Sequence, residues 1–169
     1  AGSPCAQPFW GCLDCPNAVI TVRKLPAILA FLAFVEEQRL SLPATDWAAK
    51  FGRVHVRITA QVLPAFSDAV IADAGFGISE IHLAGNSRVP PETILAALGM
   101  KPGESIFGAK LGQARNRIMA LDWVASADVV RRYPDSIFVT IVEKRPFALW
   151  QSPELVNGRG GVAVVERTG

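Results

Sequence analysis

The sequence predicts an α+β protein built on a β-α-α-β-β unit, in which two helices cover one face of a three-stranded mixed sheet. Alternating apolar residues in "DVVRRYPDSIFVTIVEK" (128–144) flank a Pro-Asp turn and predict a β-hairpin. An earlier apolar run, "ISEIHLAG", predicts a strand that closes at Gly85-Asn86, and two helical patterns lie between it and the hairpin. The 169 residues are 50% hydrophobic and 19% charged, which is a globular composition.

The first 66 residues predict mostly helix after an irregular start. "LPAILAFLAFV" is about half as long as a membrane span and is flanked by charges, so a buried amphipathic helix is expected over about 24–40. A second helix should follow "LPATDW", with Thr45 or Asp46 as its N-cap. A strand across "VHVRI" is the alternative there. Apolar residues spaced by three or four favour the helix: Trp47, Phe51, Val54, Ile58 and Val62.

The second half follows a clearer order. Ser67 or Asp68 can cap a short helix that ends at Gly75. "VPPETILAALG" predicts a helix with Gly99 as its C-cap, and "AKLGQARNRIMALDW" predicts another. In the last strand of the unit, Ile137, Val139 and Ile141 are expected to face these helices. The closing "VAVVERTG" looks like the first strand of a further, truncated β segment.

These elements divide the chain into three expected parts. Residues 1–66 form a helical segment with a Cys-containing start, residues 67–151 form the β-α-α-β-β domain, and residues 152–169 begin a β-domain.

Several short motifs in the second half resemble the POTRA domain of the bacterial cell-division family FtsQ/DivIB. The matching motifs are Leu121-Asp122-Trp123-Val124, Arg131-Arg132-Tyr133-Pro134-Asp135, Glu143-Lys144-Arg145-Pro146 and Ala148-Leu149-Trp150. The resemblance covers about residues 68–151 well and 161–169 weakly. Residues 1–66 resemble, more weakly, the tail of a phage-type integrase-related protein, which raises the possibility of a fusion.

The resemblance implies a non-enzymatic interaction module that recruits and orders septum-assembly partners. Those partners would be FtsB, FtsL and an FtsK-like protein, with FtsB and FtsL binding weakened because the β-domain is only begun here. It also implies attachment to the inner membrane through a helix missing from this chain, with the domain in the periplasm or outside the cytoplasmic membrane. The alternatives are a POTRA domain of an outer-membrane assembly or secretion protein, and a recombinase-related DNA-binding fragment in residues 1–66. The net charge of +2 is too small to support DNA binding.

The residues show little catalytic or cofactor chemistry. Cys5, Cys12 and Cys15 could supply thiolates to zinc, with His55 as the only plausible fourth ligand, but ordinary loop or core cysteines are the favoured interpretation. No nucleophile-base constellation is readable and no cofactor is expected. The basic set Arg131, Arg132, Lys144 and Arg145 could meet an acidic partner or lipid head groups, although a solvated rim is the simpler interpretation.

The expected partner site is a strand edge. In POTRA domains the last strand is central and the strand before it is an edge, and an edge can accept an extra strand from a partner. The edge would comprise nine residues: Val124, Ala125, Ser126, Ala127, Asp128, Val129, Val130, Arg131 and Arg132. The alternative is an edge that is simply exposed to solvent and protected by its charges.

Overall fold

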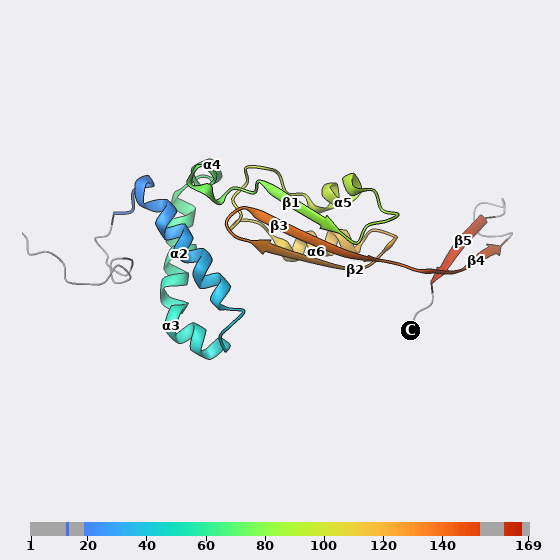
Figure 1. Cartoon of the computed structure of the whole chain (residues 1–169), viewed down its shortest axis with the longest axis horizontal. Helices are drawn as coiled ribbons and strands as arrows, with labels where there is room; N and C mark the ends of the chain where they lie inside the picture. The colour runs from blue at the N-terminus through green and yellow to red at the C-terminus, as the bar shows by residue number, and fades with distance from the viewer. Residues whose placement is uncertain (1–12, 14–18, 153–160, 167–169) are drawn as a thin grey trace, which may run out of the picture. The chain divides into compact units, whose positions relative to one another are not determined.

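The computed structural model describes Leu13, residues 19–152 and residues 161–166, and it describes side-chain surroundings through residue 145. The chain divides into two compact units. The first contains residues 1–81, 101–109 and 131–137, and the second contains residues 82–100, 110–130 and 138–169. Figure 1 shows the order of the elements along the chain.

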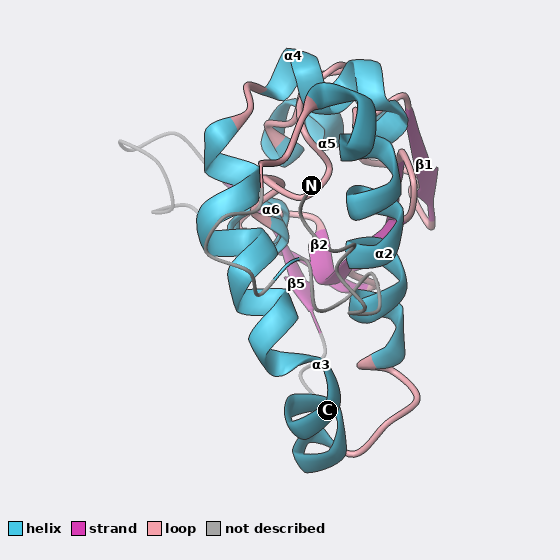
Figure 2. Cartoon of the chain, turned by 90° about the vertical axis from the view of Figure 1, so that its left-hand side faces the viewer, coloured by secondary structure: helices cyan, strands magenta, loops and turns pink. Residues whose placement is uncertain are grey.

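The first unit is mainly helical. Its two longest helices, α2 (Leu25–Gln38) and α3 (Ala44–Arg57), run side by side in Figure 2. Shorter turns follow: η2 (Ile58–Val62), η3 (Leu63–Ala65), α4 (Asp68–Ile71) and η4 (Ala72–Phe76), with η1 (Val22–Lys24) ahead of α2. The helix expected over about 24–40 and the second helix expected after it are therefore confirmed, the second in preference to a strand across "VHVRI".

Aromatic packing joins α2 to α3. Val35 of α2 is fully buried against Trp47 and Phe51 of α3, and Trp47 Nε1 donates a 2.7 Å hydrogen bond to the Val35 carbonyl. That bond satisfies the one polar atom of a buried indole. Six residues of α2 are buried, as expected of a core helix. Within the described residues, no helix combines the length and apolar character needed to cross a membrane.

Helix starts in this unit were predicted with mixed success. Ser67 caps α4, and its hydroxyl accepts from the Val70 N–H at 3.4 Å. The prediction that Thr45 or Asp46 caps α3 is wrong, because the helix begins at Ala44 with Pro43 in the cap position. Proline fixes a backbone angle that suits a helix entrance, so the helix can start two or three residues earlier than the polar caps would place it. Asp46 lies in the first turn, where the helix dipole favours an acid.

The β-α-α-β-β order is confirmed in the second half. The elements are β1 (Glu80–Ala84), α5 (Pro91–Leu98), α6 (Leu111–Met119), β2 (Val124–Arg132) and β3 (Ser136–Glu143). The sheet order is β1-β3-β2, so β3 is central. The Ser79 N–H donates to the Asp135 carbonyl at 2.9 Å, and Gly85 lies against Ile141. Both contacts advance in the same direction, so β1 and β3 are parallel, whereas the short β2–β3 turn makes that pair antiparallel.

The register expected for β3 is confirmed. Ile137, Val139 and Ile141 are each at most 2% exposed, whereas Phe138 and Val142 are 41% and 56% exposed. The helices contribute buried Ile94, Leu98, Ala114 and Ile118. Gly99 ends α5 in the left-handed conformation, and the Arg117 Nε donates to the Ala97 carbonyl at 2.7 Å. The α+β fold class is thus confirmed.

The final strands pair with each other. β4 (Pro146–Ser152) and β5 (Gly161–Glu166) are antiparallel, with a register shift between Pro146 and Ala148. The β segment expected at the end of the chain therefore has its hydrogen-bonding partner in "PFALWQS". The boundary at residue 151 remains a prediction.

Candidate functional site: the edge strand β2

The candidate docking strand occupies the place in the sheet that was expected of it. β2 spans Val124–Arg132 and has β3 as its only neighbour in the three-stranded sheet. One long side of this strand therefore carries backbone donors and acceptors that the sheet does not use. Residues 124–130 belong to the second unit, whereas Arg131 and Arg132 belong to the first.

The burial pattern of β2 departs from strict alternation. Val124 and Ala127 are buried, and two exposed residues, Ala125 and Ser126, lie between them. Such a break in the alternation is what one extra residue in the strand, a β-bulge, would produce. From Ala127 onward the alternation is regular. The regular part of the edge therefore begins at Ala127.

A side chain from α6 identifies which backbone groups of β2 point outward. The Arg115 Nε donates to the Ala127 carbonyl at 2.9 Å, a contact that a carbonyl aimed at β3 would not offer. In an antiparallel strand, the N–H and C=O of one residue point the same way and alternate with those of its neighbours. Ala127 and Val129 therefore direct their backbone groups outward, and Asp128 and Val130 direct theirs toward β3. Sequence alternation alone could not make this distinction.

The Arg115 side chain also changes what the β2 edge offers to a partner strand. Its guanidinium satisfies one outward acceptor and places a positive charge beside the strand. Charged groups at an edge are a common protection against unwanted pairing. An incoming strand that pairs at Ala127 must compete with this side chain.

The basic residues at the end of β2 do not form a simple solvated rim. Within the first unit, Arg131 donates to the Ala109 carbonyl at 2.9 Å and to the Phe107 carbonyl at 3.4 Å. Its guanidinium therefore fastens the hairpin to the 101–109 loop. The solvated-rim interpretation is wrong for Arg131, because main-chain carbonyls accept from both of its terminal nitrogens.

A second cluster of polar contacts lies where β3 ends, and it involves two of the short motifs. The Glu143 carboxylate accepts backbone N–H bonds from Ser87, Arg88 and Val89, at 2.7 to 3.1 Å. Nearby, the Lys144 N–H donates to the Trp123 carbonyl at 2.9 Å, and the Arg88 guanidinium lies 5.2 Å from the Trp123 ring centre. Glu143 thus holds the loop after β1, which is a structural task.

The Glu143 contacts predict a pH-dependent stability. Hydrogen bonds from the Val89 N–H, and then from Ser87 and Arg88, lower the pKa of Glu143 below its ordinary 4.5. A lowered folded-state pKa stabilises the fold fully above pH 4.5, and this contribution is lost as pH falls through the folded value. Glu143→Gln should therefore be less stable than the parent at neutral pH, and the difference should shrink below pH 4.5. Urea unfolding across that range measures it, and a difference that does not change with pH contradicts this assignment.

The remaining sequence-based candidates are not brought to this edge. Cys5, Cys12 and Cys15 lie outside the described residues. His55, the proposed fourth zinc ligand, contacts Glu36 at 2.5 Å. His82 stacks on Phe138 with ring centres 4.3 Å apart, on the exposed side of the strands. No group of three or more His, Cys, Asp or Glu suited to a metal occurs within the described residues.

Comparison with known proteins identifies the domain. Residues 76–144 match the family model described as "POTRA domain, FtsQ-type". All five elements of the β-α-α-β-β unit, and so the whole three-stranded sheet, lie within this range. Residues 76–144 form a POTRA domain of the FtsQ type. No solved structure matches the chain.

The curated relatives carry the same name. The chain is 30% identical to the cell division protein FtsQ of Bartonella bacilliformis over 104 residues, which is 62% of this chain and 32% of the relative. It is 33% identical to that of Caulobacter vibrioides strain NA1000 over 85 residues, which is 50% of this chain and 28% of the relative. It is 31% identical to that of Bradyrhizobium diazoefficiens over 142 residues, covering 80% of this chain and 42% of the relative. The chain thus spans less than half the length of each of these relatives.

The Bradyrhizobium match also concerns the first half of the chain. Residues 68–169 make up only about three fifths of the sequence, so an alignment over 80% of it includes part of the preceding helical segment. The similarity to FtsQ therefore extends ahead of the POTRA domain.

Proposed function

We propose that this chain is a non-enzymatic interaction module of the bacterial division machinery, and that a partner docks by adding a strand to the β2 edge. The FtsQ-type POTRA domain supports the division role, and the outward backbone groups of Ala127 and Val129 support the mode of docking. Main-chain hydrogen bonds would supply affinity, which explains why the edge carries no catalytic side chains. The FtsQ matches favour this role over an outer-membrane assembly protein or a recombinase fragment.

The proposed setting follows from the relatives' name and from the resemblance of the motifs. The partners would be FtsB, FtsL and an FtsK-like protein, and residues 67–151 would lie outside the cytoplasmic membrane as part of a membrane-anchored protein. The β4–β5 hairpin would continue into a β-domain that strengthens FtsB and FtsL binding.

A proline scan of β2 tests the docking mode. Proline cannot donate a ladder hydrogen bond, but it is tolerated where the N–H of an edge strand points outward. In the complete gene product, Ala127→Pro should stay folded and lose co-purification with division partners, whereas Ala127→Ser should retain it. Asp128→Pro is the matched control, because it removes a donor directed at β3 and should unfold the domain by circular dichroism. A folded Ala127→Pro variant that binds as the parent does would rule out strand addition at this position.

Arg115→Leu provides an independent test that does not depend on tolerance of proline. Leucine keeps an apolar stem on α6 and leaves the Ala127 carbonyl unoccupied. If a partner strand pairs there, its affinity should rise several-fold. Unchanged affinity, with the fold intact, contradicts competition between Arg115 and the partner.

A further inference from the structure

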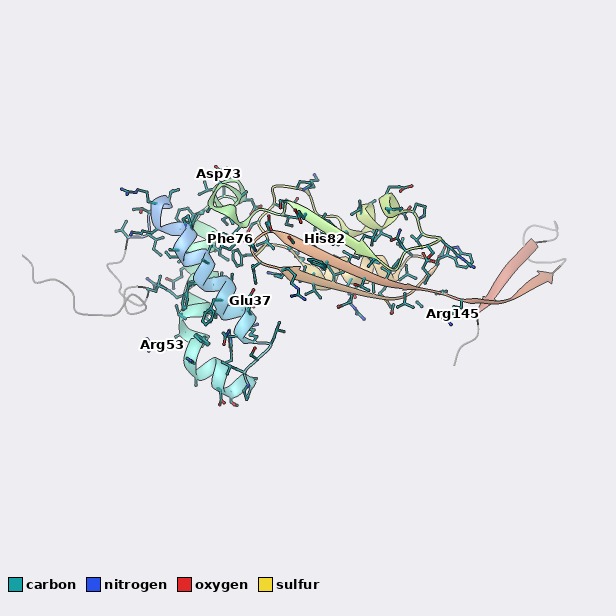
Figure 3. The ribbon with its side chains drawn as sticks, viewed as in Figure 1. Glu37, Arg53, Asp73, Phe76, His82 and Arg145 are labelled. Atoms are coloured by element: carbon teal, nitrogen blue, oxygen red, sulfur yellow. The ribbon has the colours of Figure 1, made fainter. Side chains whose placement is uncertain are left out.

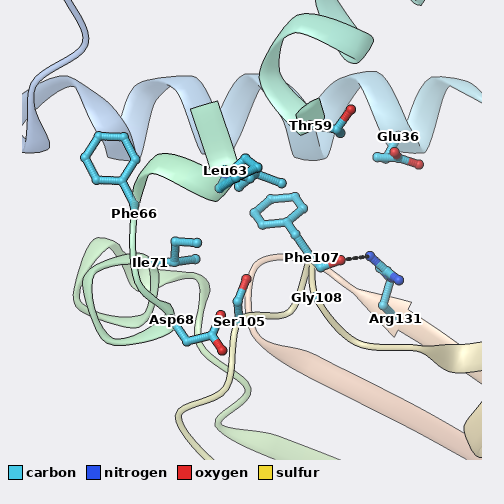
Figure 4. A pocket seen from close by; sticks show the side chains of 11 residues that line it. Glu36, Thr59, Leu63, Phe66, Asp68, Ile71, Ser105, Phe107, Gly108 and Arg131 are labelled. Atoms are coloured by element: carbon cyan, nitrogen blue, oxygen red, sulfur yellow. Dashed lines mark hydrogen bonds between the residues drawn. The ribbon is translucent and has the colours of Figure 1, made fainter. Parts of the chain in front are cut away.

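The first unit contains a pocket to which the candidate edge contributes only Arg131. Its volume is about 430 Å³, and it lies among α2, the η2–η3 turns, α4 and the 101–109 loop (Figure 4). Apolar side chains form much of its wall, including Leu63, Phe66, Ile71 and Phe107. A pocket of this size that combines apolar walls with a few polar groups is typical of a ligand site.

Most polar groups in the pocket already have partners. Glu36 contacts His55 at 2.5 Å, and the Thr59 hydroxyl donates to the His55 carbonyl at 2.8 Å. Arg131 is bound to the carbonyls of Phe107 and Ala109. These groups shape the pocket, but their strongest hydrogen bonds are made within the protein.

Two acceptors in the lining lack partners within the described part of the chain. Ser105 is only 4% exposed, and its hydroxyl makes no side-chain hydrogen bond there, although it lines the pocket and is drawn among the lining side chains in Figure 4. Asp68 also lines the pocket, and its carboxylate has neither a hydrogen bond nor an ion pair among the described residues. The Ser105 hydroxyl belongs to a buried residue but is not an enclosed, unpartnered group among the described residues, so a ligand that enters the pocket can reach it.

We propose that this pocket binds an arginine side chain of a partner protein. A guanidinium is a planar donor array that pairs well with a carboxylate and stacks on aromatic faces. Asp68 supplies the carboxylate, Ser105 supplies a second acceptor and Phe66 supplies a ring. Phe107 already stacks on Phe76 with ring centres 5.5 Å apart, so it serves as apolar wall. The aliphatic stem would lie against Leu63 and Ile71. No residue from 124 to 130 lines the pocket, so this inference does not depend on strand addition at β2.

The test is an NMR titration of the 169-residue chain with the peptide acetyl-Ala-Arg-Ala-amide. Saturable shifts are expected for the methyl groups of Leu63 and Ile71. The same peptide with citrulline, which is neutral and nearly the same shape as arginine, should bind at least tenfold more weakly. Raising the ionic strength should weaken binding of the arginine peptide, because the ion pair at exposed Asp68 is screened. A lysine peptide should bind more weakly than the arginine peptide, since an ammonium neither stacks nor bonds in two places.

Variants separate the roles of the lining residues. Asp68→Asn should raise the dissociation constant of the arginine peptide at least tenfold, and Ser105→Ala should raise it several-fold. Asp73→Asn is the matched control, because Asp73, labelled in Figure 3, is an acid of the neighbouring η4 turn outside the pocket lining. Circular dichroism establishes that each variant remains folded. The proposal is overturned if no saturable shift appears at the solubility limit of the peptide, if citrulline binds equally well, or if Asp68→Asn binds as the parent does.

Discussion

Replacing Ile141 by alanine should destabilise the POTRA domain by about 2 to 5 kcal/mol, the usual cost of removing a buried isoleucine side chain. Ile141 is 2% exposed and lies on the central strand β3, where neighbouring strands limit how far the structure can relax around a cavity. The free energy of unfolding from urea titration at neutral pH measures this loss.

Thr140→Ala is the matched control for Ile141→Ala. Thr140 is the preceding residue of the same strand and is exposed on the opposite face. Surface substitutions of this kind typically change stability by about 0.5 kcal/mol or less. Equal losses for the two variants would show that the register of β3 is displaced by one residue, which would exchange its buried and exposed faces.

Gly85→Ala should cost about 3 kcal/mol or more, because two penalties combine at this position. Gly85 has a φ of +87°, a conformation that disfavours any residue with a Cβ. In addition, a Cβ placed there would lie 1.9 Å from the Ile141 carbonyl oxygen. That contact is with backbone, so β1 and β3 would have to separate.

Gly103→Ala isolates the backbone penalty from the steric one. Gly103 has a φ of +85°, nearly the same as Gly85, but a Cβ there meets nothing within 4 Å. Gly103→Ala should therefore lose only the free energy that a left-handed backbone costs a residue with a Cβ, about 1 to 2 kcal/mol. If both glycine variants lose the same free energy in urea unfolding, the close approach of Gly85 to Ile141 does not determine the outcome.

Much of the fold could be predicted because its signals are local. The alternation on β3 gave the buried face correctly, since strand periodicity depends only on the strand itself. Gly99 and Ser67 marked a helix end and a helix start for equally local reasons. The start of α3 was missed because Thr45 and Asp46 are good caps in isolation, and the choice of Pro43 depends on how the whole helix packs.

The candidate sites depend on contacts that local patterns do not encode. Arg115 and Ala127 lie 12 residues apart on a helix and a strand, and their hydrogen bond decides which edge groups point outward. Glu143 and Ser87 are separated by 56 residues. No sequence motif predicts that Ser105 is buried, because the residues around it come from several helices of the first unit. The position of β2 at the edge could be expected from the family resemblance, whereas its hydrogen-bonding direction required the structure.

The parallel pairing of β1 with β3 has a consequence for how the chain is made. β1 is the first strand of the domain to leave the ribosome, yet its neighbour ends at Glu143, about 60 residues later. At about 5 to 20 residues per second, that interval is roughly 3 to 12 seconds. During this time the apolar strand has no sheet to join, whereas β2 and β3 can pair as soon as their short turn is complete. The domain should therefore assemble from its C-terminal hairpin backwards, and β1 is the segment most exposed to chaperones and to misfolding while it waits.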